Sequence, residues 1–219
     1  MRGPFDPSFE SLPVTLPIFP LAGALLLPRG RLPLNIFEPR YIAMTRDALS
    51  SERLIGMIQP TEDETSERPP AVYPTGCAGR IIQFAETDDG RYLITLAGLC
   101  RFDVIREVPS LGGYRRVVPD FNRYRVDMES ATGGAVDRDR LIKLLKPYLA
   151  FNKISVDWKA VATTEDDKLV TSLAMVCPFE PNEKQALLEA ATLADRGNVM
   201  IALLELAVLV RNGEESARH

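Results

Sequence analysis

Histidine is nearly absent from this 219-residue chain, because its one histidine is the last residue, His219. A Ser-His-Asp or Cys-His arrangement needs an internal histidine that takes up and releases a proton. Histidine is also the commonest protein ligand of transition metals. The sequence therefore excludes these catalytic arrangements and histidine metal sites within one chain. We expect no catalytic residues, no metal and no cofactor.

Cysteine is also scarce. Cys77, Cys100 and Cys177 are odd in number, widely separated and without a C-x-x-C spacing, which argues against a disulfide framework or a structural zinc site. Cys100, beside Arg101, is the best candidate for an activated thiol. Both residues fall in a predicted strand, however, where a cysteine is usually buried and unreactive.

Long apolar runs are missing as well. The longest lie within residues 21–27 and 199–210, and both fall short of the ~20 residues that a membrane helix needs. The N-terminal stretch, MRGPFDPSFESLP, lacks the apolar centre of a secretory signal. We therefore expect a cytoplasmic protein with reduced thiols and no membrane partner.

The chain has no surplus of positive charge. Its 26 Lys and Arg against 30 Asp and Glu give a net charge of −4, and phosphate neutralisation normally requires a basic surplus. One stretch, residues 114–125, nevertheless places arginines among aromatic residues. RNA binding through this stretch is the alternative function, and its candidate residues are Arg115, Arg116, Arg123 and Arg125.

What the chain has in quantity is proline. Residues 16–41 read LPIFPLAGALLLPRGRLPLNIFEPRY, with prolines at positions 17, 20, 28, 33 and 39. Proline fixes φ and removes a donor from the strand ladder. The pattern therefore predicts short strands separated by sharp corners.

Strand signals continue to about residue 121 and are interrupted once. Pro39 suits a first helical turn, and apolar spacing predicts a helix that ends at Ser50-Ser51. Residues 54–58 form a predicted buried strand. Residues 81–85 and 92–97 flank Asp89-Gly90, a strong hairpin signal, and further strands are expected in 102–108 and 114–118. So many short strands indicate a mostly antiparallel, partly closed barrel.

After Gly133-Gly134 the apolar period changes from two to 3.6, which predicts helices. Apolar stripes fall in 141–149 and 165–175, and Pro181 is placed to begin another helix. The last helix, about 198–211, carries only Glu205 among its central residues, so we expect it to be buried nearly all round. It is then either the middle helix of a bundle, or docked on the β-domain or on a second copy.

Three separate stretches, 16–41, 76–101 and 178–206, resemble the N-terminal substrate-binding domain of Lon proteases. The first follows the family's L-P-x-x-P-L opening, the second its G-x-x-x-x-I hairpin and G-x-x-R-[FV] strand, and the third its E-K-Q-x-L-L-E helix. The resemblance implies an α+β protein: a PUA-like, mostly antiparallel β-barrel followed by a C-terminal α-helical bundle. We expect the barrel in residues 13–126, the helices in 135–212, and flexible ends in 1–12 and 213–219.

A Lon protease also needs a phosphate-binding G-x-x-x-x-G-K-[ST] loop and a Ser-Lys pair in a separate protease domain. This chain contains no Gly-Lys dipeptide. The resemblance therefore implies the recognition module rather than an enzyme. We expect a non-catalytic polypeptide-binding protein, an adaptor or regulator of proteolysis, whose partners are unfolded or apolar segments and, as a further candidate, a protease. The oligomeric state stays open.

The candidate binding surface follows from the run LPLNIF, residues 32–37. Successive strand residues point to opposite faces, so these apolar side chains cannot all share one face. We expect some of them to be open to a partner, unless the helical subdomain covers them. A groove between the two subdomains would suit extended apolar segments, with Arg40 and Trp158 at its rim. The candidate residues are Leu34, Ile36, Phe37, Arg40, Tyr41 and Trp158.

Overall fold

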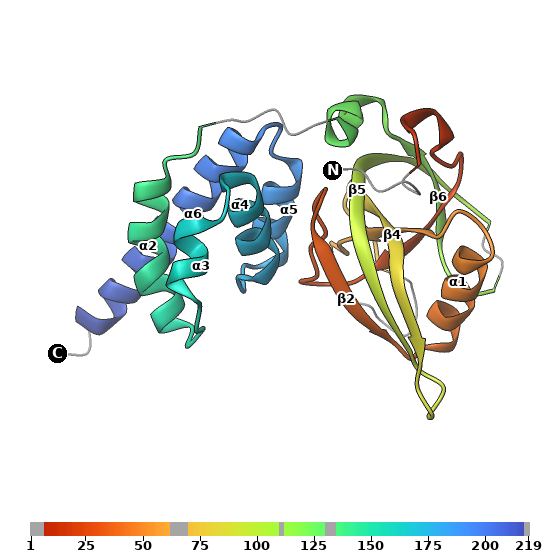
Figure 1. The fold of residues 1–219 in the computed structure, drawn as a ribbon, viewed down its shortest axis with the longest axis horizontal. Coiled ribbons are helices and arrows are strands. Elements are labelled where there is room, and N and C mark those ends of the chain that lie inside the picture. The colour runs from red at the N-terminus through yellow and green to blue at the C-terminus, as the bar shows by residue number, and fades with distance from the viewer. Residues whose placement is uncertain (1–6, 62–69, 110–111, 130–134, 217–219) are drawn as a thin grey trace. The chain divides into compact units, whose positions relative to one another are not determined.

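The computed structural model describes residues 7–61, 70–109, 112–129 and 135–216. The chain divides into two compact units, residues 1–132 and 133–219, which we name the barrel unit and the helical unit. Figure 1 shows the strands in the first and the long helices in the second. Of the predicted flexible ends, 1–12 and 213–219, residues 1–6 and 217–219 lie outside the described residues.

The barrel unit contains a six-stranded sheet in the described residues. Its strands are β1 (Leu16–Pro20), β2 (Arg31–Ile36), β3 (Leu54–Ile58), β4 (Thr75–Glu86), β5 (Tyr92–Val108) and β6 (Arg116–Asp120). They are ordered β2-β5-β4-β3-β1-β6, and β5 and β6 are also paired. Two 3-10 segments, η1 (Phe9–Ser11) and η2 (Asn122–Met128), flank the strands in sequence.

β5 is long enough for two strands to pair with the same edge of it, and this double pairing closes the barrel. Residues 92–97 pair with β2, and residues 103–108 pair with β6. Since β6 also pairs with β1, five strands form a near ring while β2 remains an edge strand. Every pairing is antiparallel except that of β1 with β3. The predicted α+β class and mostly antiparallel barrel are confirmed.

Gly98 marks the point where β5 changes partner. Its N–H donates to the Gly30 carbonyl at 2.9 Å, and its carbonyl accepts from the Arg29 N–H at 2.8 Å. A Cβ at this position would lie 2.0 Å from the Leu27 carbonyl oxygen. Only glycine lets these two backbones approach so closely.

Side chains that alternate along the strands fill the barrel. The largest fully buried residue is Phe102, whose ring lies 6.1 Å from that of Phe121. The helix predicted after Pro39 is confirmed as α1 (Pro39–Leu49). It contacts β1 and β3 through its apolar face, and its buried residues are Tyr41, Met44, Thr45 and Ala48.

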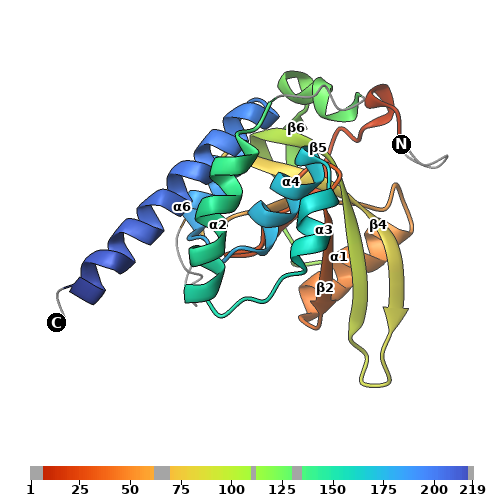
Figure 2. The ribbon, with the colours of Figure 1, turned by 60° about the vertical axis from the view of Figure 1, so that its left-hand side comes forward.

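The helical unit consists, in the described residues, of α2 (Arg138–Phe151), α3 (Trp158–Thr163), α4 (Asp166–Val176), α5 (Pro181–Glu189) and α6 (Leu193–Ser216). The sequence signals for helix starts are confirmed. The Asp137 carboxylate accepts from the Arg140 N–H before α2, and Glu180 with Glu183 forms a capping box at α5. α2, α4 and α5 pack against α6, and Figure 2 shows α2 and α6 side by side.

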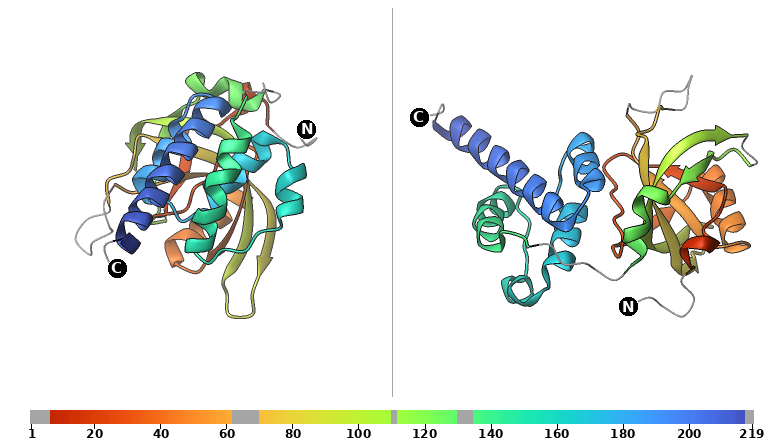
Figure 3. Two further views of the ribbon diagram at one scale, coloured as in Figure 1. Left: turned by 90° about the vertical axis from the view of Figure 1, so that its left-hand side faces the viewer. Right: turned by 90° about the horizontal axis from the view of Figure 1, so that it is seen from above.

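Within one chain, the prediction that the last helix is buried nearly all round is wrong, and its docking on a second copy stays a prediction. α6 buries Met200, Ile201 and Leu204, but Leu206, Leu209 and Val210 are 57 %, 67 % and 55 % exposed. Figure 3 shows the reason, since the C-terminal part of α6 extends past the other helices of its unit. An apolar sequence indicates burial only where neighbouring elements are long enough to cover it.

Candidate functional site

The barrel unit has a cleft of about 370 Å³ that is lined by residues of both β1 and β2. We name it the barrel cleft. Its lining is mostly apolar and comes from both strands, from the start of α1 and from the connection after β3. The lining residues are Phe19, Pro20, Leu21, Ala22, Pro33, Leu34, Asn35, Phe37, Glu38, Arg40, Tyr41, Pro60, Pro70 and Arg115.

One wall of the barrel cleft is built on two aromatic rings. The rings of Phe19 and Tyr41 have centroids 4.2 Å apart, and the Arg40 guanidinium carbon lies 4.6 Å above the Tyr41 ring. Arg40 also forms an ion pair with Glu38 at 2.9 Å. The arginine therefore covers an aromatic face while its charge is balanced by a neighbour.

Arg115, the other cation among the described lining residues, is also balanced. Arg115 donates from Nη1 to the Pro70 carbonyl at 2.6 Å and from Nε to Glu107 at 3.2 Å, and its Nη2 pairs with the same carboxylate. Both arginines thus have carboxylate partners within the unit. The barrel cleft consequently presents apolar surface with little net charge.

The structure brings together four of the six residues proposed as the polypeptide site. Leu34, Phe37, Arg40 and Tyr41 all line the barrel cleft, where Phe37 is 62 % exposed, Leu34 is half-buried and Tyr41 is largely buried. The expectation fails for Ile36, which is 1 % exposed because its side chain points into the core. Trp158 belongs to α3 in the helical unit, where Lys146 Nζ lies 5.7 Å from its ring centroid.

Sequence reasoning did not select several lining residues. Phe19, Pro20, Pro33 and Asn35 come from two strands whose pairing partners cannot be read from local patterns. The prolines were visible as a motif, and proline in a sheet is confined largely to edges. The preference of proline for sheet edges is the one sequence signal that predicts Pro20 and Pro33 beside an unpaired edge.

The four arginines of the alternative RNA site are engaged with other side chains. Arg115 pairs with Glu107, Arg125 with Glu10, and Arg123 lies 3.8 Å from Asp103. Arg116 donates from Nη2 to the Thr15 hydroxyl at 2.7 Å. Carboxylates thus balance the charge of Arg115, Arg123 and Arg125, whereas the Thr15 hydroxyl leaves the charge of Arg116 unbalanced. Phosphate binding draws on several unbalanced positive charges, so these contacts do not favour RNA binding.

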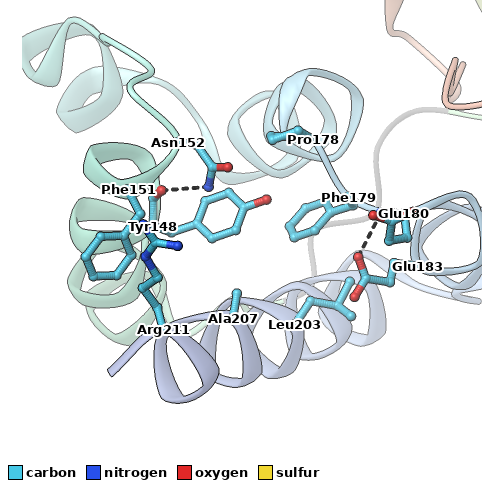
Figure 4. Close-up of a pocket in the computed structure, with 10 residues that line it drawn as sticks. All are labelled: Tyr148, Phe151, Asn152, Pro178, Phe179, Glu180, Glu183, Leu203, Ala207 and Arg211. Carbon is cyan, nitrogen blue, oxygen red and sulfur yellow. Dashed lines mark hydrogen bonds between the residues drawn. The ribbon is translucent and has the colours of Figure 1, made fainter. Parts of the chain in front are cut away.

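A second cleft, of about 260 Å³, lies within the helical unit. We name it the helical cleft. The rings of Tyr148 and Phe179 stack in it at 5.5 Å, and Figure 4 shows residues of α6 along its other side. Its lining residues are Tyr148, Phe151, Asn152, Pro178, Phe179, Glu180, Glu183, Leu203, Ala207 and Arg211.

Burial shifts the pKa values of three groups at or near the helical cleft: Tyr148, Cys177 and Lys184. Burial raises the pKa of the Tyr148 hydroxyl and raises the pKa of the Cys177 thiol to about 11. Burial also lowers the pKa of the Lys184 ammonium. Cys177 is therefore a protonated thiol at neutral pH, the reverse of an activated nucleophile.

The other two cysteines are buried as well, and Cys100 Sγ donates to the Tyr124 carbonyl at 3.3 Å. The expectation that Cys100 is a packing residue is confirmed. Across residues 7–61, 70–109, 112–129 and 135–216, no group of three or more His, Cys, Asp or Glu side chains could hold a metal ion. In the same part of the chain, no helix is long and apolar enough to span a membrane.

A family model described as the ATP-dependent protease La (LON) substrate-binding domain matches residues 15–205. The chain belongs to this family. The match includes most of the barrel unit and most of the helical unit, so the domain consists of both. The resemblance inferred from the three sequence stretches is thereby confirmed.

Relatives of the chain include Lon proteases. The one from Anaeromyxobacter dehalogenans is 26 % identical over 89 % of this chain, and the one from Desulfosudis oleivorans is 30 % identical over 82 %. These matches cover only 23 % and 22 % of the two proteases. The Lon substrate-binding chain thus spans about a quarter of the length of the curated relatives it matches.

Two solved structures share the fold. A Lon N-terminal domain protein from Xanthomonas campestris aligns with a TM-score of 0.59 at 22 % identity, over 86 % of this chain and 97 % of that one. The N-terminal domain of the Mycobacterium avium complex Lon protease aligns with the same score at 17 % identity, over 87 % and 98 %. The alignments span almost the whole of both solved chains, and they confirm the α+β Lon N-domain fold.

Proposed function

We propose that the chain is a non-catalytic polypeptide-binding module whose barrel cleft holds apolar side chains of an unfolded segment. The observation that carries this proposal is the apolar barrel cleft itself, with Phe37 exposed beside it. Family membership supports a polypeptide as the ligand, because the family is named for substrate binding in an ATP-dependent protease.

The charges around the barrel cleft support an apolar rather than a charged ligand. Arg40 is paired with Glu38, and Arg115 with Glu107, so neither arginine is left to attract an anion. A concave apolar surface with a few polar groups at its rim is the usual form of a binding site. Unfolded segments expose the apolar side chains that such a surface takes out of water.

The proposal extends to an adaptor or regulator role in proteolysis. A single cleft of this size covers only a few side chains, so we expect affinities on the order of micromolar. A weak site of this kind gains strength when several copies act together. Delivery of unfolded chains to a protease is a role in which weak, repeated contact is sufficient.

The test is a binding titration with a permanently unfolded protein, reduced and carboxymethylated α-lactalbumin carrying a fluorescent label. Fluorescence anisotropy should report saturable binding, and native α-lactalbumin should not bind. Phe37→Asp should weaken binding at least about tenfold, since it removes an apolar contact worth roughly 1.5–3 kcal/mol. Ile105→Asp is the matched control because both side chains are 62 % exposed and Ile105 lies outside the cleft lining.

Two results would count against the proposal. Absence of binding to the unfolded protein at about 100 µM would refute the proposed function, because the expected affinity is on the order of micromolar. Equal loss of binding in both variants would move the site away from the barrel cleft. Circular dichroism of each variant checks that the sheet is retained.

A further inference from the structure

β2 is an edge strand, and its outward-facing backbone groups follow from the pairing with β5. Gly98 N–H donates to the Gly30 carbonyl, and Arg31 pairs with Ala97 in the same register. In an antiparallel ladder, alternate residues direct both of their polar groups to the partner. Leu32, Leu34 and Ile36 therefore bond to β5, whereas Arg31, Pro33 and Asn35 direct their backbone groups away from it.

The position of Pro33 agrees with this alternation. Proline has no N–H, so it is tolerated in a strand where that group would face an open edge. β1 carries a proline in the same situation on the other side of the barrel cleft. Ile18 N–H donates to the Arg115 carbonyl of the segment that leads into β6. Two residues on, Pro20 directs its backbone to the same side of β1, beyond the end of that pairing.

The open edge of β2 thus offers a defined set of hydrogen-bonding groups beside an apolar cleft. Arg31 and Asn35 each offer an N–H and a carbonyl, and Pro33 offers a carbonyl only. Within the described residues, no backbone hydrogen bond joins these groups to another segment. All three side chains are exposed, and Pro33 and Asn35 line the barrel cleft.

We infer that the barrel cleft takes its polypeptide as an added β-strand, paired with the open edge of β2. This inference rests on the proposed function and specifies the ligand's conformation. Hydrogen-bond complementarity selects an extended backbone, because only a strand presents N–H and carbonyl groups at the spacing of Arg31, Pro33 and Asn35. The six residues of β2 span about 20 Å, so the occupant needs at least five extended residues.

The added strand also determines which side chains enter the cleft. Alternate residues of a strand face the same side, so every second side chain of the occupant lies over the apolar wall of Phe19, Leu34 and Tyr41. The preferred ligand therefore alternates apolar and polar residues. A peptide of equal composition with helical apolar spacing should bind more weakly.

A second copy of this chain fits the edge poorly. The outer face of β2 presents Arg31, Pro33 and Asn35, which offer little apolar area for a dimer. Proline on an exposed edge also disfavours continuous pairing between two identical strands. A short peptide that pairs through Arg31 and Asn35 avoids the missing donor at Pro33.

Asn35→Pro tests the inference directly, with Asn35→Ala as its matched control. Both variants remove the side-chain amide, but only proline removes the outward N–H, and the bond to β5 is unaffected in either. A ten-residue peptide of alternating Val and Thr is the probe. Asn35→Pro should weaken its binding about fivefold, the value of one hydrogen bond, and Asn35→Ala should stay within about twofold of the original chain.

Hydrogen exchange of the full chain gives a second readout that does not depend on a variant. Without peptide, the Arg31 and Asn35 amides should exchange quickly and the Leu32 and Leu34 amides slowly. Saturating peptide should slow hydrogen exchange at the Arg31 and Asn35 amides at least about tenfold, because both N–H groups become hydrogen-bonded to the peptide. Unchanged exchange at both residues, despite binding, would overturn the inference and leave the proposed function intact.

The remaining outcomes are equally distinct. If the original chain binds neither peptide nor unfolded protein, the proposed function fails rather than the strand geometry alone. Equal affinity of Asn35→Pro and Asn35→Ala would overturn strand addition. If sedimentation shows a dimer that Asn35→Pro converts to a monomer, a second copy occupies the edge and the peptide inference is wrong.

Discussion

Arg101 and Asp127 form a buried ion pair that fastens η2 to β5. The two side chains are 3 % and 7 % exposed. Asp127 accepts from Arg101 Nε and Nη2, both at 2.8 Å, and from the Arg101 backbone N–H at 3.0 Å. The guanidinium also lies 4.7 Å from the centroid of the Tyr124 ring. Burial lowers the pKa of Arg101, but hydrogen bonds and attraction from Asp127 outweigh it, so the net pKa is raised.

Asp127→Ala should destabilise the barrel unit by about 3–5 kcal/mol, because it leaves the Arg101 charge buried without a partner. Arg101→Met should lower the free energy of unfolding by a comparable amount, because it leaves the Asp127 carboxylate buried without its cation. The double variant Arg101→Met with Asp127→Leu should cost less than either single change, since no buried charge remains. The double-mutant cycle therefore predicts strong coupling, in contrast to the additivity expected of distant sites.

Urea denaturation followed by far-ultraviolet circular dichroism reports the unfolding of both units, because helices and strands both contribute to that signal. The one tryptophan, Trp158, belongs to the helical unit, and its fluorescence follows that unit separately. A loss below about 1 kcal/mol in Asp127→Ala would refute the reasoning, because that is the range of an exposed ion pair. A double variant as unstable as the sum of the singles would refute the argument about buried charge.

Gly98→Ala should cost about 3 kcal/mol or more, since its Cβ would lie 2.0 Å from the Leu27 carbonyl oxygen. Gly90→Ala has open space around it but a left-handed φ of +79°, so it should cost only about 1–2 kcal/mol, and equal losses in urea denaturation would contradict this. Cys177 should affect stability in alkali. Its thiol pKa is raised from 9.0 to about 11, so the unfolded chain loses the proton first. The free energy of unfolding should then fall by roughly 2 kcal/mol between pH 9 and pH 11, and a flatter curve for Cys177→Ala would confirm it.

Much of the fold could be predicted because its signals are local. Pro39 at a first helical turn, Asp89-Gly90 at a hairpin tip and Pro181 before the capping box each act within a few residues. These signals correctly indicated α1, the β4–β5 hairpin and α5. The burial of the last helix has no such local signal, because it depends on whether α2 and α4 reach its far end.

The candidate site was only partly predictable for the same reason. Alternation cannot bury all of the apolar side chains around Leu34 and Phe37, and both residues line the barrel cleft. The same argument predicts that Ile36 is open to a partner, yet Ile36 is buried. The alternation of side chains along a strand shows that the strand has two faces, but it does not show which face packs against the core.

The sequence by itself determined the family and the α+β class, because motif residues and apolar periodicity can be read directly. Only the tertiary structure decided that β5 pairs with both β2 and β6, which leaves β2 at an edge beside an open cleft. It also paired Arg101 with Asp127 and gave carboxylate partners to Arg115 and Arg125. Such contacts join residues far apart in the chain, and no local pattern records which distant segments will meet.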